Sequence, residues 1–270
     1  MTATVVDLLE PAELEPLLGD ANLLVVDLCN DGMYPKAHIP GAIHVSPAEL
    51  MCGIPPAAGK LPSVPQLERL FSRIGLTPEK RVVAYDDEGG GWAGRFLWTL
   101  EVIGHPHSTY LNGGIHAWRN EGHPVEAGIV EPTPSEVSIT TLQREAIAEI
   151  EDILPRLGQP DFAILDARSP GEYQGLRPAA QRSGHIPGAI NCEWTVLMDP
   201  TRHYRIRSDA REYLASLGIT PDKEVVTHCQ SHHRSGFTWL VARLLGYPRV
   251  RGYHGSWSEW GNRDDTPIEI

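Results

Sequence analysis

The sequence lacks the features that mark membrane proteins and nucleic-acid-binding proteins. No apolar stretch among its 270 residues approaches the ~20 residues needed to span a bilayer, and the N-terminal segment MTATVVDLLEPAELEPLLGD has no basic region of the kind that opens a signal peptide. The formal net charge of −12 gives no global attraction to nucleic acid or to an anionic membrane. We therefore expect a soluble, cytoplasmic protein and a monomer, in which local positive groups attract any anion that it handles.

Cysteine is scarce and its spacing indicates no disulfide framework. The four cysteines form no C-x-x-C pair, which is typical of free thiols in a reducing compartment. Cys29, Cys52 and Cys192 are interpreted as small apolar residues in or near a core. Cys229 differs, because it stands in the polar segment THCQSHHRSGFTWL between a β-like run and an apolar helical run.

Most of the chain is an internal repeat. The string HIPGAI occurs at residues 38–43 and again at 185–190, each time after a strand-like run that ends in aspartate. Further on, RIGLTPEKRVVAY matches SLGITPDKEVVTH, and both halves then end near a tryptophan, Trp118 and Trp260. Similarity over most of each half predicts a duplicated domain. We predict a first domain at 1–125, an extended linker with proline steps at 126–146, and a second domain at 147–270.

Each half has the pattern of a small α/β domain. The runs LLVVD, RVVAY, FAILD and EVVTH are continuous apolar stretches of strand length, which suit a parallel sheet that is covered on both faces. These runs alternate with helical segments. We therefore expect two tandem α/β domains, each a small parallel sheet flanked by helices on both faces.

Cys229 is expected at the carboxyl end of a parallel strand, facing the start of a helix that Ser235 suits as N-cap. This is the usual ligand position of an open α/β sheet, where loop amides and the helix end favour a negative group. A helix dipole contributes only ~0.3–1 kcal/mol, so a lowered thiol pKa also needs amide hydrogen bonds and cations. Arg234 is the candidate cation, together with His232 or His233 when protonated. We predict an ionised, nucleophilic Cys229.

The first half offers an internal comparison at the matching place. There the segment RVVAYDDEGGGWAGRF puts Asp86 at the position of Cys229 and glycines at 89–91, where the histidines and Arg234 stand in the second half. Aspartate has no thiol chemistry, and acidic residues repel an anion. We predict that the first domain is inert and provides structure and one wall of the cleft.

Several motifs together resemble the rhodanese family of sulfurtransferases: HIPGAI after an aspartate strand, a lone cysteine that opens a loop, and GSWSEW near the C-terminus. The resemblance covers both halves, and the loop CQSHHRSG is most similar to that of bacterial tandem-domain rhodaneses with a CQ[ST]HHRSG loop. It implies a persulfide on Cys229, an inert first domain, and no cofactor or metal. The persulfide cradle that it implies consists of Gln230, Ser231, His232, His233, Arg234 and Ser235.

The resemblance also implies a reaction, the transfer of sulfane sulfur from a small anionic donor such as thiosulfate. The acceptor is cyanide or another thiophilic nucleophile, with a sulfur-accepting protein as a further candidate. Vertebrate-type rhodaneses bind thiosulfate with basic residues where this chain has Ser231 and Glu172, so Arg234 and the histidines are the candidate replacements. The loop lacks the C-G-S-G pattern of 3-mercaptopyruvate sulfurtransferases, which makes that activity a less favoured alternative, as is a non-catalytic or persulfide-carrying module.

Two other kinds of site fit the loop less well. Cysteine phosphatases carry Cys-x5-Arg, whereas this loop is Cys-x4-Arg, and one residue spans ~3.3–3.6 Å of a ring that must close around a phosphoryl group. A zinc site built from His228, Cys229, His232 and His233 would crowd its ligands into one loop, with no second cluster at a useful spacing.

Outside the loop, residues that occur in both halves are interpreted as scaffold, because one of the halves is inert. These residues are His38, His185, Asp27 and Asp166. Candidate substrate contacts are found only in the second half and comprise Arg168, Arg182 and Trp194, with Arg177 as a further arginine. Trp194 and Trp257 either line the cleft or pack in a core.

Overall fold

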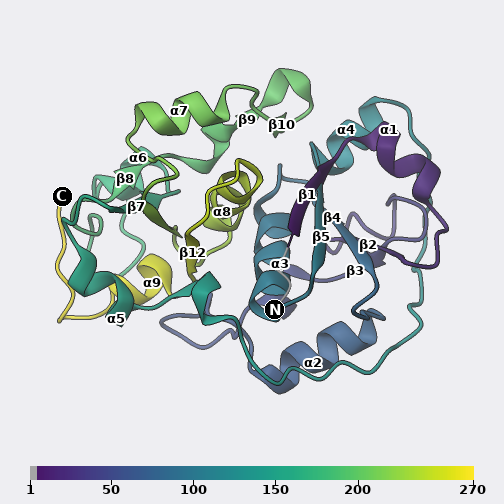
Figure 1. The fold of residues 1–270 in the computed structure, drawn as a ribbon, viewed down its shortest axis with the longest axis horizontal. Helices are drawn as coiled ribbons and strands as arrows, with labels where there is room; N and C mark the ends of the chain where they lie inside the picture. The colour runs from purple at the N-terminus through teal and green to yellow at the C-terminus, as the bar shows by residue number, and fades with distance from the viewer. Residues whose placement is uncertain (1–4) are drawn as a thin grey trace.

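The structure is a computed structural model that describes residues 5–270, and it contains two parallel sheets of the same topology (Figure 1). Residues 1–4, with which the predicted first domain and its N-terminal segment begin, lie outside the described residues. The first sheet has the spatial order β1-β5-β4-β2-β3 and consists of β1 (Val5–Leu9), β2 (Leu23–Asp27), β3 (Ile43–His44), β4 (Arg81–Tyr85) and β5 (His107–Leu111). The second has the order β6-β12-β11-β7-β8 and consists of β6 (Ile147–Ala148), β7 (Phe162–Asp166), β8 (Ile190–Asn191), β11 (Glu224–His228) and β12 (Val250–Tyr253).

Helices lie on both faces of each sheet. Those of the first half are α1 (Pro11–Leu14), α2 (Val64–Arg73), α3 (Gly91–Val102) and α4 (Gly114–Asn120). Those of the second half are α5 (Ile150–Ile153), α6 (Pro170–Tyr173), α7 (Ala210–Ser216), α8 (Arg234–Leu244) and α9 (Ser256–Trp260). Short 3-10 turns are η1 (Glu15–Leu17), η2 (Pro47–Leu50), η3 (Arg144–Ala146), η4 (Leu154–Arg156), η5 (Trp194–Leu197) and η6 (Pro200–Arg202), and a small antiparallel pair joins β9 (Met198–Asp199) to β10 (Arg205–Ile206). The predicted fold class is confirmed.

The central strands are apolar throughout because each of their faces packs against helices. In β4, Val82 and Ala84 contribute to the core that contains α2 and α3, while Val83 and Tyr85 contribute to the core beneath α1 and α4. β11 divides its side chains in the same way between two cores. This two-sided burial explains why the strand segments show runs of apolar residues instead of an alternating pattern.

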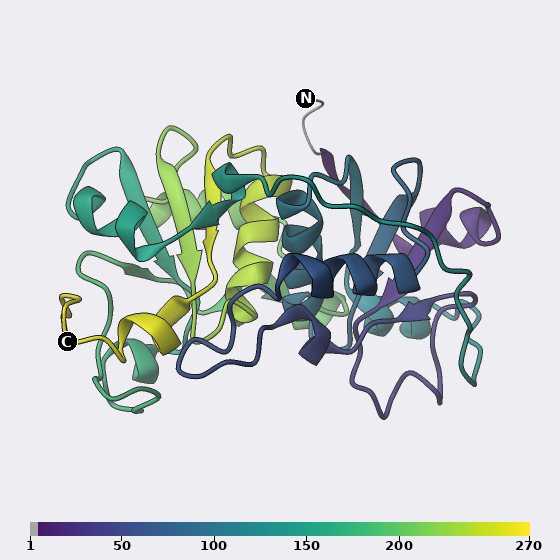
Figure 2. The ribbon, with the colours of Figure 1, turned by 90° about the horizontal axis from the view of Figure 1, so that it is seen from below.

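One hydrophobic core continues from the first half into the second through α3 and α8. Figure 2 shows these two helices side by side at the centre, with the sheets to either side. Gly94 of α3 and Gly236 of α8 make the close approach possible, because a Cβ built on Gly94 would lie 2.5 Å from the Gly236 carbonyl oxygen. The two halves are therefore joined along a packed helix pair.

Polar contacts add to this junction. Lys60, in the first-half segment between η2 and α2, forms ion pairs with Glu149 at 3.1 Å and Glu259 at 2.7 Å in the second half. In the opposite direction, Arg205 of β10 forms an ion pair with Glu10 at 2.7 Å. Each half thus sends a segment across the junction.

The segment predicted as linker runs over the surface of the first half. Ser135 donates its backbone N–H to Ser72 at 2.9 Å, and Gln143 donates to Val102 at 2.8 Å before η3 begins. At its start, Glu126 forms an isolated β-bridge with His38. The boundaries 125 and 146 themselves stay a prediction.

A matching bridge joins His185 to Glu269 in the second half. In both halves the histidine ring stacks on a tyrosine, with centroids 4.2 Å apart for His38 and Tyr34 and 3.7 Å apart for His185 and Tyr173. The repeated HIPGAI string thus anchors the chain at the end of each half, which agrees with the scaffold interpretation of the histidines.

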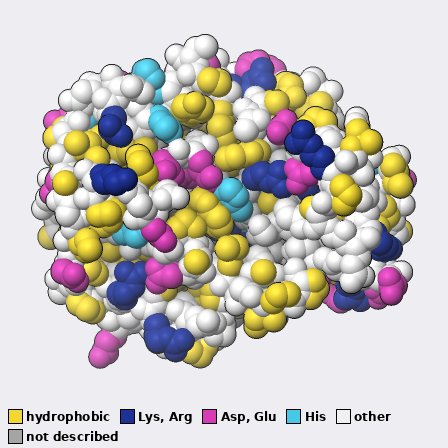
Figure 3. Space-filling model, turned by 180° about the vertical axis from the view of Figure 1, so that it is seen from behind, with side chains coloured by type: hydrophobic (Ala, Val, Ile, Leu, Met, Phe, Trp, Pro, Cys, Tyr) yellow, Lys and Arg dark blue, Asp and Glu magenta, His cyan; other side chains and the backbone are white. Residues whose placement is uncertain are grey.

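The surface shows no segregation of charge on the face drawn in Figure 3, where acidic and basic side chains are interspersed. Within residues 5–270, no helix is both long enough and apolar enough to cross a membrane.

Candidate functional site

Cys229 directly follows β11, near the middle of the second sheet, and α8 begins five residues later at Arg234. Its side chain is buried, with 1% exposed. The turn between strand and helix includes His232 in the left-handed region, at φ 58°. The structure therefore places the Cys229 thiol as predicted, at the carboxyl end of a strand and facing the start of a helix.

The start of α9 holds the backbone of Cys229 in place. The Cys229 N–H donates to the Ser256 hydroxyl at 3.3 Å, while the Cys229 carbonyl accepts from Trp257 N–H at 3.0 Å. The next carbonyl, that of Gln230, accepts from Ser258 N–H at 3.0 Å. Because these carbonyls are engaged on the α9 side, the loop is fixed from behind. This role of Ser256 was not predicted, although the GSWSEW motif contains it.

The Cys229 thiol is strongly buried and nevertheless acidic. Burial raises its pKa, but the Arg234 charge and hydrogen bonds from the Ser235 hydroxyl and amide outweigh burial, with a smaller contribution from His233, so the pKa lies below its ordinary value. Ser235 also lies close to His232, with 2.8 Å between Ser235 Oγ and His232 Nδ1. The site therefore contains a short polar chain from the His232 ring through the Ser235 hydroxyl to the sulfur.

The two loop histidines differ in environment. His232 is fully buried, and burial followed by the Arg95 charge holds its pKa well below the usual range, so it is neutral. Its ring meets Trp98 of the first half edge-on, with centroids 4.5 Å apart. His233 stacks on Trp92, with centroids 4.1 Å apart, and pairs with Glu88. Both histidines thus contact the first half, which the sequence did not reveal.

Arg234 makes a two-pronged ion pair with Glu172, at 2.7 and 2.8 Å. Although burial opposes it, the bond from Arg234 and that from Ser169 lower the Glu172 pKa to about 2, and Glu172 is therefore ionised at neutral pH. Glu172 stands where vertebrate-type rhodaneses have a basic residue that binds thiosulfate. It is thus the direct partner of Arg234, the cation expected to replace that basic residue. The Arg234 charge is largely balanced before any substrate binds.

The remaining loop side chains point to other neighbours. Gln230 Nε2 donates to the Ala179 carbonyl at 2.8 Å, so its side chain contacts the insertion that only the second half carries. The Ser231 backbone packs against Gly59 of the first half so closely that a Cβ there would overlap it. For these two residues, the contribution to a cradle would come from the backbone.

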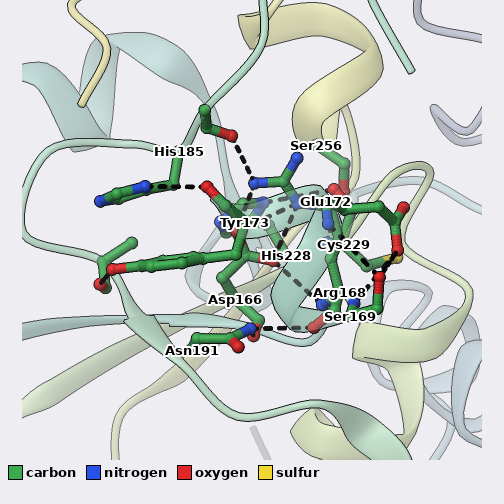
Figure 4. Close-up of polar contacts among 12 residues, drawn as sticks. Asp166, Arg168, Ser169, Glu172, Tyr173, His185, Asn191, His228, Cys229 and Ser256 are labelled. Atoms are coloured by element: carbon green, nitrogen blue, oxygen red, sulfur yellow. Dashed lines mark hydrogen bonds and ion pairs between the residues drawn. The ribbon is translucent and has the colours of Figure 1, made fainter. Parts of the chain in front are cut away.

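Behind the loop lies a buried charged group (Figure 4). Arg168, 1% exposed, pairs with Asp166 at 2.6 Å and donates to the Gly184 carbonyl at 2.9 Å. His228 Nε2 lies 3.5 Å from the same carboxylate, yet burial lowers its pKa to about 4. Arg168 has no exposed group to offer a substrate, so its geometry favours a bracing role.

The other candidate contacts are spread around the second half. Arg182 donates to the carbonyls of Thr266 and Trp260, at 2.9 and 3.1 Å, and ties the insertion to the C-terminal segment, while Arg177 is exposed. Trp194 lies near the loop, with its ring centroid 5.7 Å from that of His233. Trp257 is buried beneath the Arg168 guanidinium, 4.4 Å from it. Of this group, Trp194 lies near the His233 ring, and Trp257 contacts the cysteine loop through its backbone N–H, which donates to the Cys229 carbonyl.

The matching loop of the first half already contains an anion. Asp86 Oδ1 accepts backbone N–H bonds from Glu88, Gly89 and Gly90 at 3.2, 3.1 and 2.8 Å, and Oδ2 accepts from Ala93 at 3.0 Å. Burial and the Glu88 charge raise its pKa to about 6, in spite of these bonds. The loop thus folds into a set of amides that surround one negative group.

Beside this loop is a hollow of about 480 Å³ with an acidic lining, made by Asn30, Asp31, Ser46, Pro47, Ala48, Asp87, Glu88 and Trp92. Across the described part of the chain, no three His, Cys, Asp or Glu side chains gather as metal ligands. In the cysteine loop, His228 faces Asp166 and His232 faces Ser235, so the side chains of the hypothetical zinc site diverge.

Residues 10–121 and 149–263 each match the family described as Rhodanese-like domain, and the chain therefore belongs to this family. Over 262 residues it is 54% identical to a protein of Pseudomonas aeruginosa named thiosulfate sulfurtransferase, covering 97% of this chain and 96% of that protein. A protein of Azotobacter vinelandii with the same name is 53% identical, with the same coverage. The solved structure of the Tum1 protein from Saccharomyces cerevisiae superposes with a TM-score of 0.82 at 24% identity, covering 96% of this chain and 95% of that one, which supports the fold.

Proposed function

We propose that this protein is a sulfurtransferase of the thiosulfate type, which carries sulfur as a persulfide on Cys229. The observation that carries the proposal is that two buried thiols have pKa values shifted in opposite directions. Burial raises the pKa of Cys192 to about 12, whereas the equally buried Cys229 has a lowered pKa because Arg234 and Ser235 face it. Only a thiolate is a good nucleophile, so the surroundings of Cys229 serve ionisation.

The reaction has two displacements. The Cys229 thiolate attacks the outer sulfur of thiosulfate, a new S–S bond forms, the old one breaks, and sulfite leaves with the bonding electron pair. Cyanide or another thiophilic nucleophile then attacks the outer sulfur of the persulfide, and the Cys229 thiolate is released. Both thiolate and persulfide are anions at the same place, and stabilisation of that charge is the main task of the loop.

The cradle is proposed to consist of the backbone from Gln230 to Ser235, which resembles the CQ[ST]HHRSG loop of bacterial tandem-domain rhodaneses. The first-half loop supports this assignment, because there the matching amides already surround the Asp86 carboxylate. In the second half the persulfide sulfur would occupy the equivalent place. Ser235 adds a hydroxyl that the first half lacks, since Ala93 stands at the matching position.

The charge of the cysteine site bears on which donor it binds. The paired Arg234 and Glu172 leave the site less positive than two free cations would, so a dianion such as thiosulfate is bound mainly by amides. The acceptor is a small thiophile such as cyanide, and a sulfur-accepting protein remains a candidate. We assign the reaction to the cytoplasm, because the described cysteines are all free thiols.

Intact-mass measurement of the purified protein tests this function. After incubation with thiosulfate, the wild type should gain the mass of one sulfur atom, and cyanide should remove it with formation of thiocyanate. Cys229→Ala should not gain this mass, whereas Cys52→Ala should gain it like the wild type. Absence of a cyanide-removable sulfur in the wild type, or its persistence in Cys229→Ala, would overturn the proposal. Repeating the loading with 3-mercaptopyruvate compares the alternative donor directly.

A further inference from the structure

A segment of the first half lies directly on the cysteine loop of the second. It connects η2 to α2, and we call its residues 51–62 the strap; Figure 2 shows it as the blue loop that leaves the first half and reaches α9. Gly59 of the strap packs against the backbone of Ser231 so closely that a Cβ there would overlap it. Because Ser231 is two residues from Cys229, the strap covers part of the loop that carries the thiol.

Charged and backbone contacts fasten the strap to the second half. Lys60 pairs with Glu149 at 3.1 Å and with Glu259 at 2.7 Å. The neighbouring Leu61 N–H donates to His254 Nδ1 at 3.0 Å. The Lys60 side chain is 32% exposed, so water and salt reach its ion pairs. Lys60 thus holds the strap by contacts that solvent weakens, and we call it the latch.

The strap is a compact loop that turns back on itself. Cys52 N–H donates to the Lys60 carbonyl at 2.8 Å, and Gly53 N–H donates to the Ala58 carbonyl at 3.0 Å. Its tip, residues 53–56, is exposed to solvent. These internal bonds let the strap move as one unit about its two ends once the latch is released.

The second half contains a matching segment, which serves as an internal comparison. Residues 198–207, which include β9 and β10, cross to the first half. A Cβ on Gly89 of the Asp86 loop would lie 2.5 Å from the sulfur of Met198. The loop after the central strand of each half is therefore covered by a segment from the other half.

The two covering segments differ in how firmly they are held. Arg205 is the equivalent latch over the Asp86 loop, with ion pairs to Glu10 at 2.7 Å and to Glu121 at 2.5 Å. Its side chain is 10% exposed, against 32% for Lys60. An arginine engages two carboxylates with a rigid fork of donors, whereas a lysine is a flexible, strongly hydrated point charge. The loop that contains the thiol therefore has the looser cover.

We propose that the strap is a lid over the cysteine loop, latched by Lys60, which opens to admit an acceptor as large as a protein thiol. Cys229 is 1% exposed in the closed arrangement, so a thiol carried by a protein needs such a movement to reach its sulfur. Thiosulfate and cyanide are small and need a narrower opening. The class of acceptor rests on the proposed function, whereas the lid itself does not.

Labelling of Cys229 with two neutral thiol reagents of different size tests the lid on the full chain. All variants carry Cys52→Ala, because Cys52 is the one cysteine within residues 5–270 that is not buried. We expect Lys60→Met to react about fivefold faster than this parent with polyethylene-glycol maleimide at low salt, because loss of the ion pairs raises the open fraction. Reaction with iodoacetamide should stay within about twofold of the parent rate, since a small reagent depends less on opening. Mass spectrometry measures both rates.

The matched control is Arg205→Met, which removes the equivalent latch over the Asp86 loop. It should leave both rates at Cys229 unchanged. The lid is overturned if Lys60→Met, folded by circular dichroism, keeps the parent rate with the large reagent, or if it accelerates both reagents equally. An equal effect of Arg205→Met and Lys60→Met would overturn it too, because it would reflect general loosening of the junction.

The salt dependence of the parent gives a second measurement that needs no change at Lys60. Salt screens partly exposed ion pairs, so a rise from about 0.02 M to about 0.5 M should speed the large reagent about threefold relative to iodoacetamide. If the ratio of the two rates is independent of salt, the proposal is overturned, whether or not Lys60→Met folds.

The acceptor class is tested with the persulfide form and reduced serum albumin as the protein thiol. The albumin thiolate attacks the outer sulfur, the S–S bond to Cys229 breaks, and Cys229 leaves as thiolate. Lys60→Met should speed this transfer about fivefold and leave transfer to cyanide within about twofold. An equal effect on both acceptors would overturn the assignment of a protein thiol.

The labelling experiment needs no sulfur donor, so it is independent of the persulfide measurement. A protein that forms no persulfide, but whose labelling responds to Lys60→Met, would refute the proposed function and leave the lid intact. A protein that forms the persulfide, but whose labelling ignores Lys60→Met, would refute the lid and leave the function intact.

Discussion

At the scale of single residues, the surroundings of a thiol decide whether it reacts. Burial raises the pKa of Cys29 and of Cys192, and no cation close to either overcomes it. Cys229 is as deeply buried, yet Arg234 and Ser235 reverse the direction of the shift. Hydrogen bonds to a charged group contribute ~1.5–3 kcal/mol each, which is enough to offset much of a desolvation penalty. Few contacts therefore separate a buried thiol with a lowered pKa from one with a raised pKa.

Ser235→Ala removes the hydroxyl between His232 and the sulfur. We expect the pKa of Cys229 to rise, because the thiolate loses one donor, and alkylation at pH 7 to slow about tenfold. The rate as a function of pH, measured by mass spectrometry, gives the shift. Thr238→Ala in the next turn of α8 is the control and should keep the wild-type profile. An unchanged profile in Ser235→Ala would show that the amides and Arg234 suffice.

Glu172→Gln releases Arg234 from its carboxylate partner. The freed guanidinium should attract a dianionic donor, so we expect KM for thiosulfate to fall about three- to tenfold at low ionic strength, with a smaller change in kcat. Steady-state thiocyanate formation measures both constants. If KM is unchanged at low salt and at high salt, the Arg234 charge does not contribute to donor binding.

The same variant also shows how the contribution of this ion pair to the free energy of unfolding depends on pH. The Glu172 pKa lies at about 2 in the folded protein, below its ordinary value of 4.5, so the stability from the pair is complete above pH 4.5 and is lost as pH falls towards 2. Wild type should exceed Glu172→Gln by at most ~3 kcal/mol at neutral pH, and the two should converge near pH 2. Urea unfolding across this range gives the comparison. A constant difference at all pH values would contradict it.

At the scale of elements, the pairing of α3 with α8 joins the two halves. Their contact depends on Gly94 and Gly236, which let the two backbones meet directly. Such a contact fixes the distance between the helices and, with it, the position of His232 against Trp98 and of His233 against Trp92. The cysteine loop is consequently positioned from both halves.

Gly94→Ala should disturb this contact. Its Cβ would lie 2.5 Å from the Gly236 carbonyl oxygen, so the helices must separate, at a cost of about 2 kcal/mol or more in the free energy of unfolding. Thermal and urea unfolding measure the loss. Gly171→Ala in α6 is the matched control, because there the new Cβ meets only the flexible Arg177 side chain, at 3.4 Å. Equal effects of the two substitutions would argue against a tight junction.

At the scale of the whole molecule, one fold occurs twice and carries two different loops at the same position. The strand orders match position for position, and both halves close with a histidine–glutamate bridge. The loops differ in charge: Asp86 lies with Asp87 and Glu88, whereas Cys229 lies with Arg234 and the histidines. A thiol placed in the first loop would meet negative charge instead of positive.

Asp86→Cys, made in the Cys229→Ala background, tests whether the fold alone confers the reaction. We expect no cyanide-removable sulfur on the new cysteine, because Glu88 and Asp87 raise the pKa of a thiol there. Intact mass after thiosulfate treatment is the measurement, with the wild type as positive control. Sulfur loading at position 86 would show that the amide loop is sufficient without local positive charge.

Much of the fold and the position of Cys229 could be predicted from the sequence, because both depend on local sequence patterns. The repeat and the apolar runs specify the sheets, and the step from β11 through a polar loop to α8 places Cys229 at the strand end. The pairing of Arg234 with Glu172, the burial of His232 and the contact of His233 with Trp92 could not be predicted in this way. Each joins residues that are 62 or more positions apart, or depends on the angle at which α3 meets α8.

The sequence by itself determined the duplicated α/β fold, and it predicted the reactive half and the thiol, since these depend on periodicity, on repetition and on one residue exchanged between two copies. Only the tertiary structure decided which charged side chains have an ion-pair partner. It paired Arg234 with Glu172, placed Arg168 against Asp166, and buried Arg95 with a bond to the Leu50 carbonyl but no carboxylate partner within residues 5–270. The physical reason is that a side chain's charge acts through space, according to the distance and burial of groups that the chain order does not bring together.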